Sequence, residues 1–257
     1  MTRFEATLLA VGRSEIPGPE LFWMSDWDAW YPLVFQVVLL RDAGVTVLVN
    51  TGPGPDLRAL NDRWSAVLGE RAVLHRSPGE LLADQLARQG VSPEDVTHVI
   101  LTPLQLYTVG NVLAFPAAQI CLARRGWIQF HTTHAHPHDD RASSIPDDIL
   151  VHLVTDVWPR VRLLGDEEEI LPGLRAWWCG GHHRASMVVE ADTDAGTAAI
   201  SDCYFYLDNV ERNHPIGITE NIAEALAAYQ RVRDTADIVL PLYDPANFDR
   251  YPGGRVK

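Results

Sequence analysis

One short apolar run does most to limit the folds that are open to this chain. Residues 96–102 read Val-Thr-His-Val-Ile-Leu-Thr, and their β-branched and apolar side chains predict a buried strand. Pro103 ends the strand, because proline has no backbone N–H to donate to a neighbouring strand. Residues 101–111 therefore contain the carboxyl end of a strand, where open α/β sheets bind their ligands. We expect functional residues there.

The rest of the chain alternates apolar strand patterns with helical ones, which is typical of α/β proteins. Strands are predicted at residues 7–11, 33–40, 45–50, 109–113, 119–122, 161–164, 174–179, 187–191, 197–200 and 238–240. Helices are predicted at residues 56–68, 78–89 and 220–233, and a hairpin turn at residues 42–44. No repeat or linker interrupts this order, so we expect a single domain over residues 1–257.

The charged residues exclude several classes of function. The formal net charge is −13 at pH 7, and the acidic residues are spread along the chain. Nucleic acids and anionic membranes require clustered cations, so we expect neither as a partner. Lys257 is the only lysine, which excludes an interior Schiff base or phosphate-loop lysine. A small molecule is the expected partner, and a homo-oligomer is possible on this sequence.

The cysteines and the apolar runs bear on localisation. Cys121, Cys179 and Cys203 form no Cys-x-x-Cys pair and no even-numbered set, which favours a reducing compartment. The longest apolar stretch, residues 31–40, is too short to cross a bilayer. We therefore expect a cytoplasmic protein.

Five short motifs, taken in their order along the chain, carry a family resemblance. They are Asn-Thr-Gly-Pro-Gly at 50–54, Asp-Val-Thr-His-Val-Ile-Leu-Thr at 95–102, Pro-Gly at 172–173, Gly-Gly-His at 180–182 and Ser-Asp at 201–202. Over residues 22–245 the chain resembles the metallo-β-lactamase superfamily, and within it the N-acyl-homoserine-lactonase-like hydrolases. The resemblance implies an α/β fold, a four-layer αββα sandwich.

The resemblance also implies where metal ligands would lie. In that family a His-x-His-x-Asp-His motif follows the position of Thr102, and it holds two metal ions with a bridging hydroxide. The matching residues here are Pro103, Gln105, Tyr107 and Thr108, with Tyr243 at the place of the family's last histidine. Only His182 and Asp202 match ligand positions. We therefore expect no dinuclear site and no cofactor.

A second group of candidate metal ligands lies between residues 131 and 140. Its members are His131, His134, His136, His138, Asp139 and Asp140. Imidazoles and carboxylates at this density could bind zinc or another divalent metal in a rebuilt site. The alternative is a solvated loop that binds only adventitious metal. A third possibility is substrate contact at the cleft rim, through His134.

Acid/base chemistry without a metal is a further possibility. His182 and Asp202 could exchange protons with a substrate if the fold brings them together, and Tyr107 is the third catalytic candidate. The alternative is structural: His182 as a hydrogen-bonded residue at a sheet end and Asp202 as a turn cap. Cys203 could be a nucleophile activated by His182, although a lone cysteine is more often a small buried apolar residue.

Several polar and aromatic side chains are candidates for substrate binding. They are Gln105, Thr108, Tyr204, Tyr206 and Tyr243. Tyrosines that converge on the cleft would form an aromatic pocket with phenol donors. Otherwise they are ordinary core or rim residues. The lactonase resemblance implies a substrate-contacting tyrosine near Asp202, the region of Tyr204 and Tyr206.

Three hypotheses from different classes follow. The preferred one is a hydrolase or lyase-type enzyme that acts on a small organic molecule by metal-independent acid/base chemistry in the cleft. The second is a lactone or ester hydrolase whose rebuilt metal site uses the histidine-rich segment. The third is a non-catalytic binding protein, a pseudoenzyme.

Overall fold

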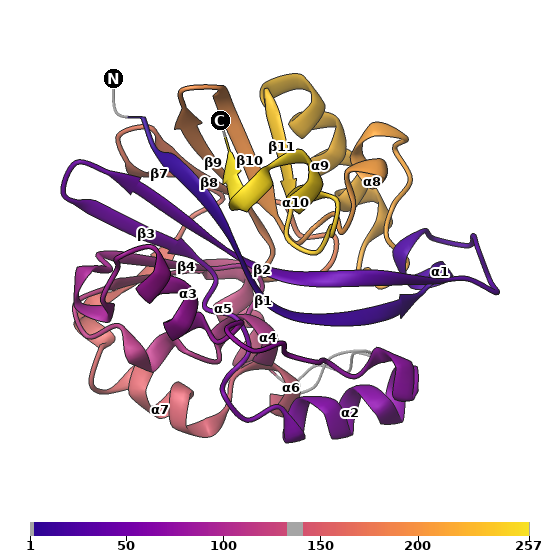
Figure 1. Ribbon diagram of the computed structural model, residues 1–257, viewed down its shortest axis with the longest axis horizontal. Coiled ribbons are helices and arrows are strands. Elements are labelled where there is room, and N and C mark those ends of the chain that lie inside the picture. Colours follow the sequence, from indigo (N-terminus) through magenta and orange to yellow (C-terminus); the bar gives the residue numbers. More distant parts are fainter. Residues whose placement is uncertain (1–2, 133–140, 257) are drawn as a thin grey trace.

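Two β-sheets lie face to face between outer layers of helices (Figure 1). The computed structural model describes residues 3–132 and 141–256. Buried side chains from both sheets form one continuous apolar core, which includes Val37 and Leu39 from one sheet and Met187 and Val189 from the other. This is the four-layer αββα arrangement that the sequence motifs imply, so the predicted fold class is confirmed.

The larger sheet has seven strands in the order β12-β1-β2-β3-β4-β5-β6. Their bounds are β1 Glu5–Pro17, β2 Trp30–Asp42, β3 Val45–Val49, β4 His98–Leu101, β5 Gln119–Ala123, β6 Val161–Leu164 and β12 Arg255–Val256. β12, β1, β2 and β3 pair antiparallel, whereas β3 to β6 pair parallel. β3, β4 and β5 are mostly apolar and buried because both of their faces are covered, whereas β6 lies at the edge of the sheet and carries Arg162.

The smaller sheet has five strands in the order β11-β10-β9-β8-β7. Their bounds are β7 Glu167–Leu171, β8 Leu174–Trp178, β9 Met187–Thr193, β10 Gly196–Ser201 and β11 Ile238–Pro241. β7 to β10 are joined antiparallel, and β11 pairs parallel with β10 after a helical crossover.

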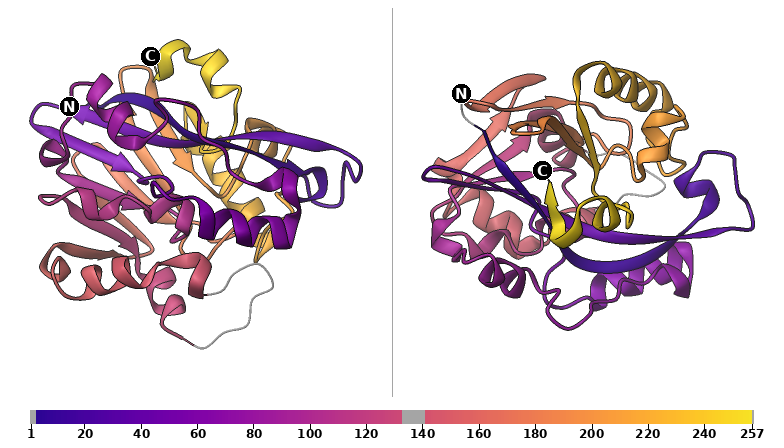
Figure 2. Two further views of the ribbon diagram at one scale, coloured as in Figure 1. Left: turned by 60° about the horizontal axis from the view of Figure 1, so that its bottom comes forward. Right: turned by 45° about the horizontal axis from the view of Figure 1, so that its top comes forward.

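Helices cover the outside of both sheets. On the side of the larger sheet lie α2 Arg58–Leu68, α3 Leu82–Arg88, α5 Arg124–Phe130 and α7 Asp147–Val154. On the opposite side lie α8 Leu207–Glu211 and α9 Ile222–Thr235, as two further views show (Figure 2). The short helices are α1 Gly18–Leu21, α4 Leu106–Val109, α6 Arg141–Ser144 and α10 Asn247–Arg250. Within the described ranges, no helix is long and apolar enough to cross a membrane.

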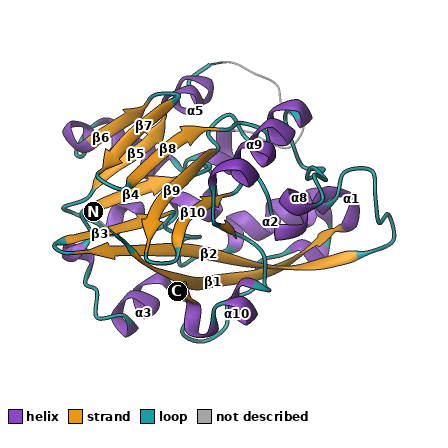
Figure 3. Ribbon diagram, turned by 90° about the horizontal axis from the view of Figure 1, so that it is seen from above, coloured by secondary structure: helices purple, strands orange, loops and turns teal. Residues whose placement is uncertain are grey.

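Two long antiparallel strands extend from one side of the molecule. β1 and β2 pair from Glu5 and Arg41 to Pro17 and Trp30, and α1 lies at their far end (Figure 3). The sequence pattern predicted only residues 7–11 of β1, because Gly12 interrupts the apolar alternation. The register shifts at this point, between Ala10 and Gly12, and the strand then continues.

The predicted strand at residues 109–113 is wrong. Val109 ends α4, and a short 3₁₀ turn follows at Val112–Ala114. The backbone here is already paired elsewhere: Gly110 N–H donates to the Gly52 carbonyl at 3.0 Å, and Thr51 N–H donates to the Thr108 carbonyl at 2.7 Å. Strand β7 was not predicted, because its first three residues are glutamates, and α7 was also missed.

Asn50 fixes the loops that build the functional region. It follows β3 with a positive φ of 67°. Its side-chain amide donates to the Thr102 carbonyl at 2.7 Å and accepts from the Thr102 N–H at 2.8 Å. This two-way bond holds the ends of β3 and β4 together. The loops after β4, β8, β10 and β11 all contribute residues to one cavity at this edge of the sandwich.

Candidate functional site

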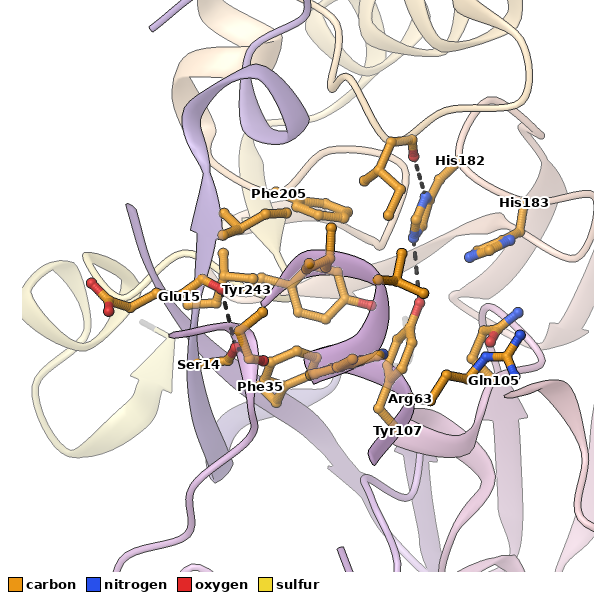
Figure 4. Close-up of a pocket in the computed structure, with 17 residues that line it drawn as sticks. Ser14, Glu15, Phe35, Arg63, Gln105, Tyr107, His182, His183, Phe205 and Tyr243 are labelled. Atoms are coloured by element: carbon orange, nitrogen blue, oxygen red, sulfur yellow. Dashed lines mark hydrogen bonds between the residues drawn. The ribbon is translucent and has the colours of Figure 1, made fainter. Parts of the chain in front are cut away.

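A cavity of about 90 Å³ opens where these loops meet (Figure 4). Its wall is largely aromatic, with the rings of Phe35, Trp64, Tyr107, Phe205 and Tyr243. These rings come from β2, α2, α4 and the loops after β10 and β11. The site is thus assembled from distant parts of the chain, and residues 101–111 contribute to it as predicted from the strand that precedes them.

His182 is held in one orientation by hydrogen bonds at both ring nitrogens. Its Nδ1 lies 2.6 Å from the Ile218 carbonyl oxygen, and its Nε2 lies 3.3 Å from the Tyr107 hydroxyl (Figure 4). A carbonyl only accepts, so Nδ1 carries the proton in this arrangement. In the neutral ring Nε2 is then the acceptor, and it faces the cavity beside a phenol. This is the geometry of a proton acceptor with an adjacent donor.

Two glycines bring His182 close to α9. Gly180 and Gly181 have φ values of 59° and 71°, in the left-handed region that glycine adopts at little cost. A Cβ on Gly181 would lie 3.1 Å from both Ala225 of α9 and the Cys203 sulfur. The Thr219 hydroxyl donates to the Gly181 carbonyl at 2.7 Å. The Gly-Gly-His motif is therefore a tight connection that packs against the helix and aims the imidazole.

The tyrosines are held by ring-to-ring packing. The Tyr107 ring lies 5.6 Å from both Phe35 and Trp64, and the Tyr243 ring lies 5.1 Å from Phe35 and 4.7 Å from Phe205. These edge-to-face and tilted contacts restrict the rings to one position. Burial, together with the neighbouring Tyr107, raises the pKa of Tyr243 well above its ordinary value. Tyr243 therefore stays a neutral phenol.

Asp202 lies beneath the site and not in the described lining of the cavity. Its side chain is fully buried, and it accepts hydrogen bonds from the hydroxyls of Thr102 and Ser186. Burial raises the pKa of the Asp202 carboxyl, and the two hydroxyls and His183 partly oppose that rise. The carboxylate joins the end of β4 to the loop after β8, so it supports the site from below. The hydrogen-bond partner that faces the cavity with His182 is Tyr107.

His183, which the sequence did not single out as a site residue, also lines the cavity. Its ring centroid lies 4.0 Å from that of His182, and its Nδ1 lies 3.6 Å from a Glu220 carboxylate oxygen. Arg184 donates to the same glutamate at 2.9 Å and pairs with Glu224 of α9. This ion-pair network fixes the loop that carries both histidines.

The predicted substrate-binding residues divide into two groups. Gln105 and Tyr243 line the cavity. Thr108 is buried and closes a turn, because its hydroxyl donates to the Pro103 carbonyl at 2.6 Å. The Tyr204 hydroxyl donates to the Ala199 carbonyl at 3.0 Å, and Tyr206 donates to the Pro32 carbonyl. Thr108, Tyr204 and Tyr206 thus hold the framework, outside the described lining.

The candidates for other chemistry lie away from the cavity lining or outside the described residues. Cys203 is fully buried behind the Gly181 loop. His131 follows the last residue of α5 as its C-cap, and its ring packs against Trp127 at 4.6 Å. Burial, with a smaller effect from Arg141, lowers the pKa of His131. His134, His136 and His138 lie outside the described residues.

A dinuclear metal centre does not fit the donors that the described residues provide. Across residues 3–132 and 141–256, no three His, Cys, Asp or Glu side chains group closely enough to hold a metal ion. The Gln105 amide and the phenols of Tyr107 and Tyr243, which the sequence resemblance matches to ligand positions, line the cavity. Neutral amides and phenols are poor ligands for zinc compared with imidazole and carboxylate.

Comparisons with known proteins bear on the fold. No family model matches the chain. The N-acyl homoserine lactonase AiiB of Agrobacterium fabrum is 27% identical over 171 residues, which cover 65% of this chain and 62% of the relative. Human metallo-beta-lactamase domain-containing protein 1 is 29% identical over 169 residues, covering 65% and 54%. The matches thus span less than two thirds of these relatives.

Several solved structures superpose on this chain over nearly its whole length. An N-acyl homoserine lactone hydrolase with N-hexanoyl-L-homoserine bound at its catalytic metal centre superposes with a TM-score of 0.81 at 18% identity, covering 100% of both chains. AidC, a dizinc quorum-quenching lactonase, gives 0.66 at 14% identity, covering 98% of this chain and 92% of AidC. The metallo-β-lactamase fold expected from the sequence motifs is therefore confirmed.

Proposed function

We propose that this chain, which has the metallo-β-lactamase fold and a likeness to N-acyl homoserine lactonases, is an enzyme that uses His182 and Tyr107 for metal-independent acid/base chemistry. Its substrate is a small, largely apolar organic molecule bound in the aromatic cavity. One observation carries the proposal: His182 donates from Nδ1 to the Ile218 carbonyl and presents Nε2 to the cavity beside the Tyr107 hydroxyl. The fold is that of hydrolases, and lactones and esters are the first substrates to test.

The arrangement supports a simple hydrolytic sequence. His182 Nε2 accepts a proton from a water molecule while the water oxygen attacks the carbonyl carbon of the ester or lactone. When the substrate binds, the Tyr107 hydroxyl breaks its hydrogen bond to His182 Nε2 and donates instead to the carbonyl oxygen, where negative charge develops. This change leaves Nε2 free to accept the proton of the water molecule. His182 then returns the proton to the leaving alkoxide oxygen. The aromatic wall keeps bulk water away, which strengthens each of these electrostatic interactions.

A second candidate function is a metal-dependent lactone or ester hydrolase. The observation that favours it is the similarity to lactonases, one of which is described as a dizinc enzyme. Its metal would be held by the histidine-rich segment around residues 131–138. A non-catalytic binding protein is the third candidate, and it predicts ligand binding without turnover.

One experiment separates the three candidates. The purified protein is treated with a chelator, divided, and assayed against a panel of lactones and esters with and without added zinc. The variants are His182→Ala and Tyr107→Phe, with His152→Ala and Tyr251→Phe as matched controls outside the cavity lining. Chelator-resistant turnover that His182→Ala abolishes supports the proposal. Turnover that needs zinc supports the second candidate, and binding alone supports the third.

A further inference from the structure

Arg76 is a partly buried arginine that donates hydrogen bonds to backbone carbonyls of the loop after β3. Its Nη2 donates to the Pro53 and Gly54 carbonyls at 3.0 and 2.9 Å, and its Nη1 donates to the Pro55 carbonyl at 3.3 Å. Its Nε donates to the Val11 carbonyl of β1 at 3.2 Å. The guanidinium therefore ties three consecutive carbonyls of this loop to the larger sheet.

The backbone that carries Arg76 is itself anchored on β1. The preceding residue, His75, exchanges two backbone hydrogen bonds with Arg13 of β1, at 2.8 and 2.7 Å. Burial lowers the pKa of Arg76, and the charge of the nearby Glu80 partly opposes that effect. An arginine side chain nevertheless stays protonated in proteins, so its bonds to the loop carbonyls are charge-assisted and stronger than neutral ones.

The same loop holds the segment that carries Tyr107. The N–H and the hydroxyl of Thr51 both donate to the Thr108 carbonyl, at 2.7 and 2.8 Å. The Asn111 amide donates to the carbonyls of Thr51 and Pro53, at 2.7 and 2.9 Å. The Pro53 carbonyl thus accepts hydrogen bonds from both Asn111 and the guanidinium. Through this carbonyl the arginine is joined to the residues that follow α4.

The loop and the end of α4 are in contact without spare room. A Cβ on Gly110 would lie 2.0 Å from the Gly54 nitrogen, and the Gly110 N–H donates to the Gly52 carbonyl at 3.0 Å. Towards β1, a Cβ on Gly52 would lie 2.9 Å from the Val11 side chain. Closely packed groups transmit a displacement to their neighbours. A shift of the loop would therefore move α4, and with it the Tyr107 hydroxyl.

We propose that Arg76 is a positioning residue for the reaction: by holding the loop of residues 50–55, it sets the place of α4 and so of the Tyr107 hydroxyl. Arg76 lies outside the described lining of the cavity, so it acts through the backbone and not on the substrate. The inference rests on the proposed function for its effect on turnover, but the positioning can be measured without a substrate. Lysine would not replace Arg76, because an ammonium group lacks the planar fork that reaches several carbonyls at once.

Hydrogen–deuterium exchange of the full chain measures the positioning without turnover. In Arg76→Ala we expect the backbone amides of residues 106–112 to exchange about tenfold faster or more than in the wild type, because several bonds to a charged group are lost. Arg76→Lys should show a smaller increase in the same segment, and it serves alone if Arg76→Ala does not fold. Unchanged exchange of residues 106–112 in the folded variants overturns the proposal.

Arg233→Ala is the matched control for this measurement. Arg233 of α9 also donates to a backbone carbonyl, that of Val210 at 2.6 Å, and it lies outside the described cavity lining. Its replacement should leave the exchange of residues 106–112 unchanged, and urea unfolding shows that each variant is folded. Faster exchange of residues 106–112 in Arg233→Ala, by as much as in Arg76→Ala, would mean a general loss of stability and would overturn the assignment.

Turnover of the best substrate in the lactone and ester panel tests whether Arg76 acts through Tyr107. For Arg76→Lys we expect kcat to fall by about tenfold to a hundredfold with KM within about twofold, because the donor is misplaced and the binding walls are kept. In the Tyr107→Phe background the same substitution should change kcat little, since the hydroxyl through which it acts is absent. Wild-type kcat in Arg76→Lys, or equal losses of kcat in the two backgrounds, overturns the proposal.

The two proposals fail in different ways. If exchange of residues 106–112 rises in Arg76→Ala but turnover is unaffected by His182→Ala, the catalytic proposal fails and the positioning of this segment by Arg76 stands. If turnover depends on His182 and Tyr107 while exchange and kcat are unchanged in the Arg76 variants, the positioning role fails and the catalytic proposal stands.

Discussion

The His182 Nε2 lies 3.3 Å from the Tyr107 hydroxyl, and both residues line a cavity that the two halves of the sandwich form together. His182 follows β8 of the smaller sheet, and Tyr107 belongs to α4, after β4 of the larger one. The pair therefore exists only when the two sheets are docked.

Replacement of His182 is expected to remove the proton acceptor. For His182→Ala we expect kcat/KM to fall by about 10²–10⁴, the usual contribution of a positioned general base. The measurement is turnover of the best substrate from the lactone and ester panel. His152→Ala, on the outside of α7, should retain activity. A His182→Ala protein with wild-type turnover contradicts the assignment.

Replacement of Tyr107 tests the phenol donor separately from its ring. Tyr107→Phe keeps the packing against Phe35 and Trp64 and removes only the hydroxyl. We expect kcat to fall by about 10²–10³, as for the loss of one donor to a developing oxyanion. KM should change little. If kcat is retained and KM rises, Tyr107 contributes to ground-state binding and not to the reaction.

The left-handed loop before His182 is expected to tolerate no side chain. Gly181→Ala should lose about 1–2 kcal/mol from the positive φ alone, and more from contact with Ala225 and Cys203. It should also lose turnover, because the imidazole is displaced. Gly90→Ala is the matched control: its φ is 67°, with nothing within 4 Å of an added Cβ. Chemical denaturation and activity together separate strain from loss of position.

Stability at acidic pH should depend on Glu190. This buried carboxylate accepts from Trp177 Nε1 at 2.9 Å and pairs with Arg175. Burial acts to raise its pKa, but the bonds from Arg175 and Trp177 outweigh that effect, so the folded pKa lies below the ordinary 4.5. A depressed folded pKa stabilises the protein above the unfolded value, and this stability is lost as the pH falls through the folded pKa.

Glu190→Gln should therefore be less stable than the wild type at pH 7, by about 1–3 kcal/mol for the loss of a charge-assisted bond. The difference should narrow as the pH falls below 4.5, the ordinary pKa of glutamate, toward the lower folded pKa of Glu190. Urea unfolding of both proteins over a series of pH values from 7 downward measures this difference. A difference that does not depend on pH would show that the carboxylate charge does not contribute.

Removal of metal distinguishes metal-independent turnover from zinc-dependent turnover. We expect chelation to leave turnover within about twofold, since the described cavity offers no imidazole and carboxylate cluster for zinc. Elemental analysis after zinc reconstitution should find less than about one-tenth equivalent bound. Loss of turnover on chelation and recovery with zinc would instead support a site in the histidine-rich segment, for which His131→Ala, His134→Ala and His136→Ala are the next variants.

Much of the fold follows from local patterns in the sequence. Apolar alternation and β-branched runs predicted nearly all strands of both sheets. The four-layer sandwich was implied by the family resemblance that the five short motifs carry. The pattern failed where local signals were weak or misleading. The glutamates of β7 show no apolar alternation, so nothing in the sequence indicated a strand there. In the structure Arg162 of β6 supports this strand, since its Nε donates to a Glu168 carboxylate oxygen at 3.0 Å. Residues 109–113 resemble a strand, but the loop after β3 takes their backbone hydrogen bonds.

The site residues also divide into those that the sequence predicted and those that only the structure identified. From the sequence alone we predicted Gln105, Tyr107, His182 and Tyr243 as site residues, and the structure places all four in the lining of one cavity. Only the tertiary structure decided that Arg63, Trp64 and His183 join them, and that Asp202, Thr108 and Tyr204 serve the framework. The physical reason is that strand and helix formation depends on neighbours within a few residues. A cavity instead depends on which side chains far apart in the chain share one volume once the sheets pack.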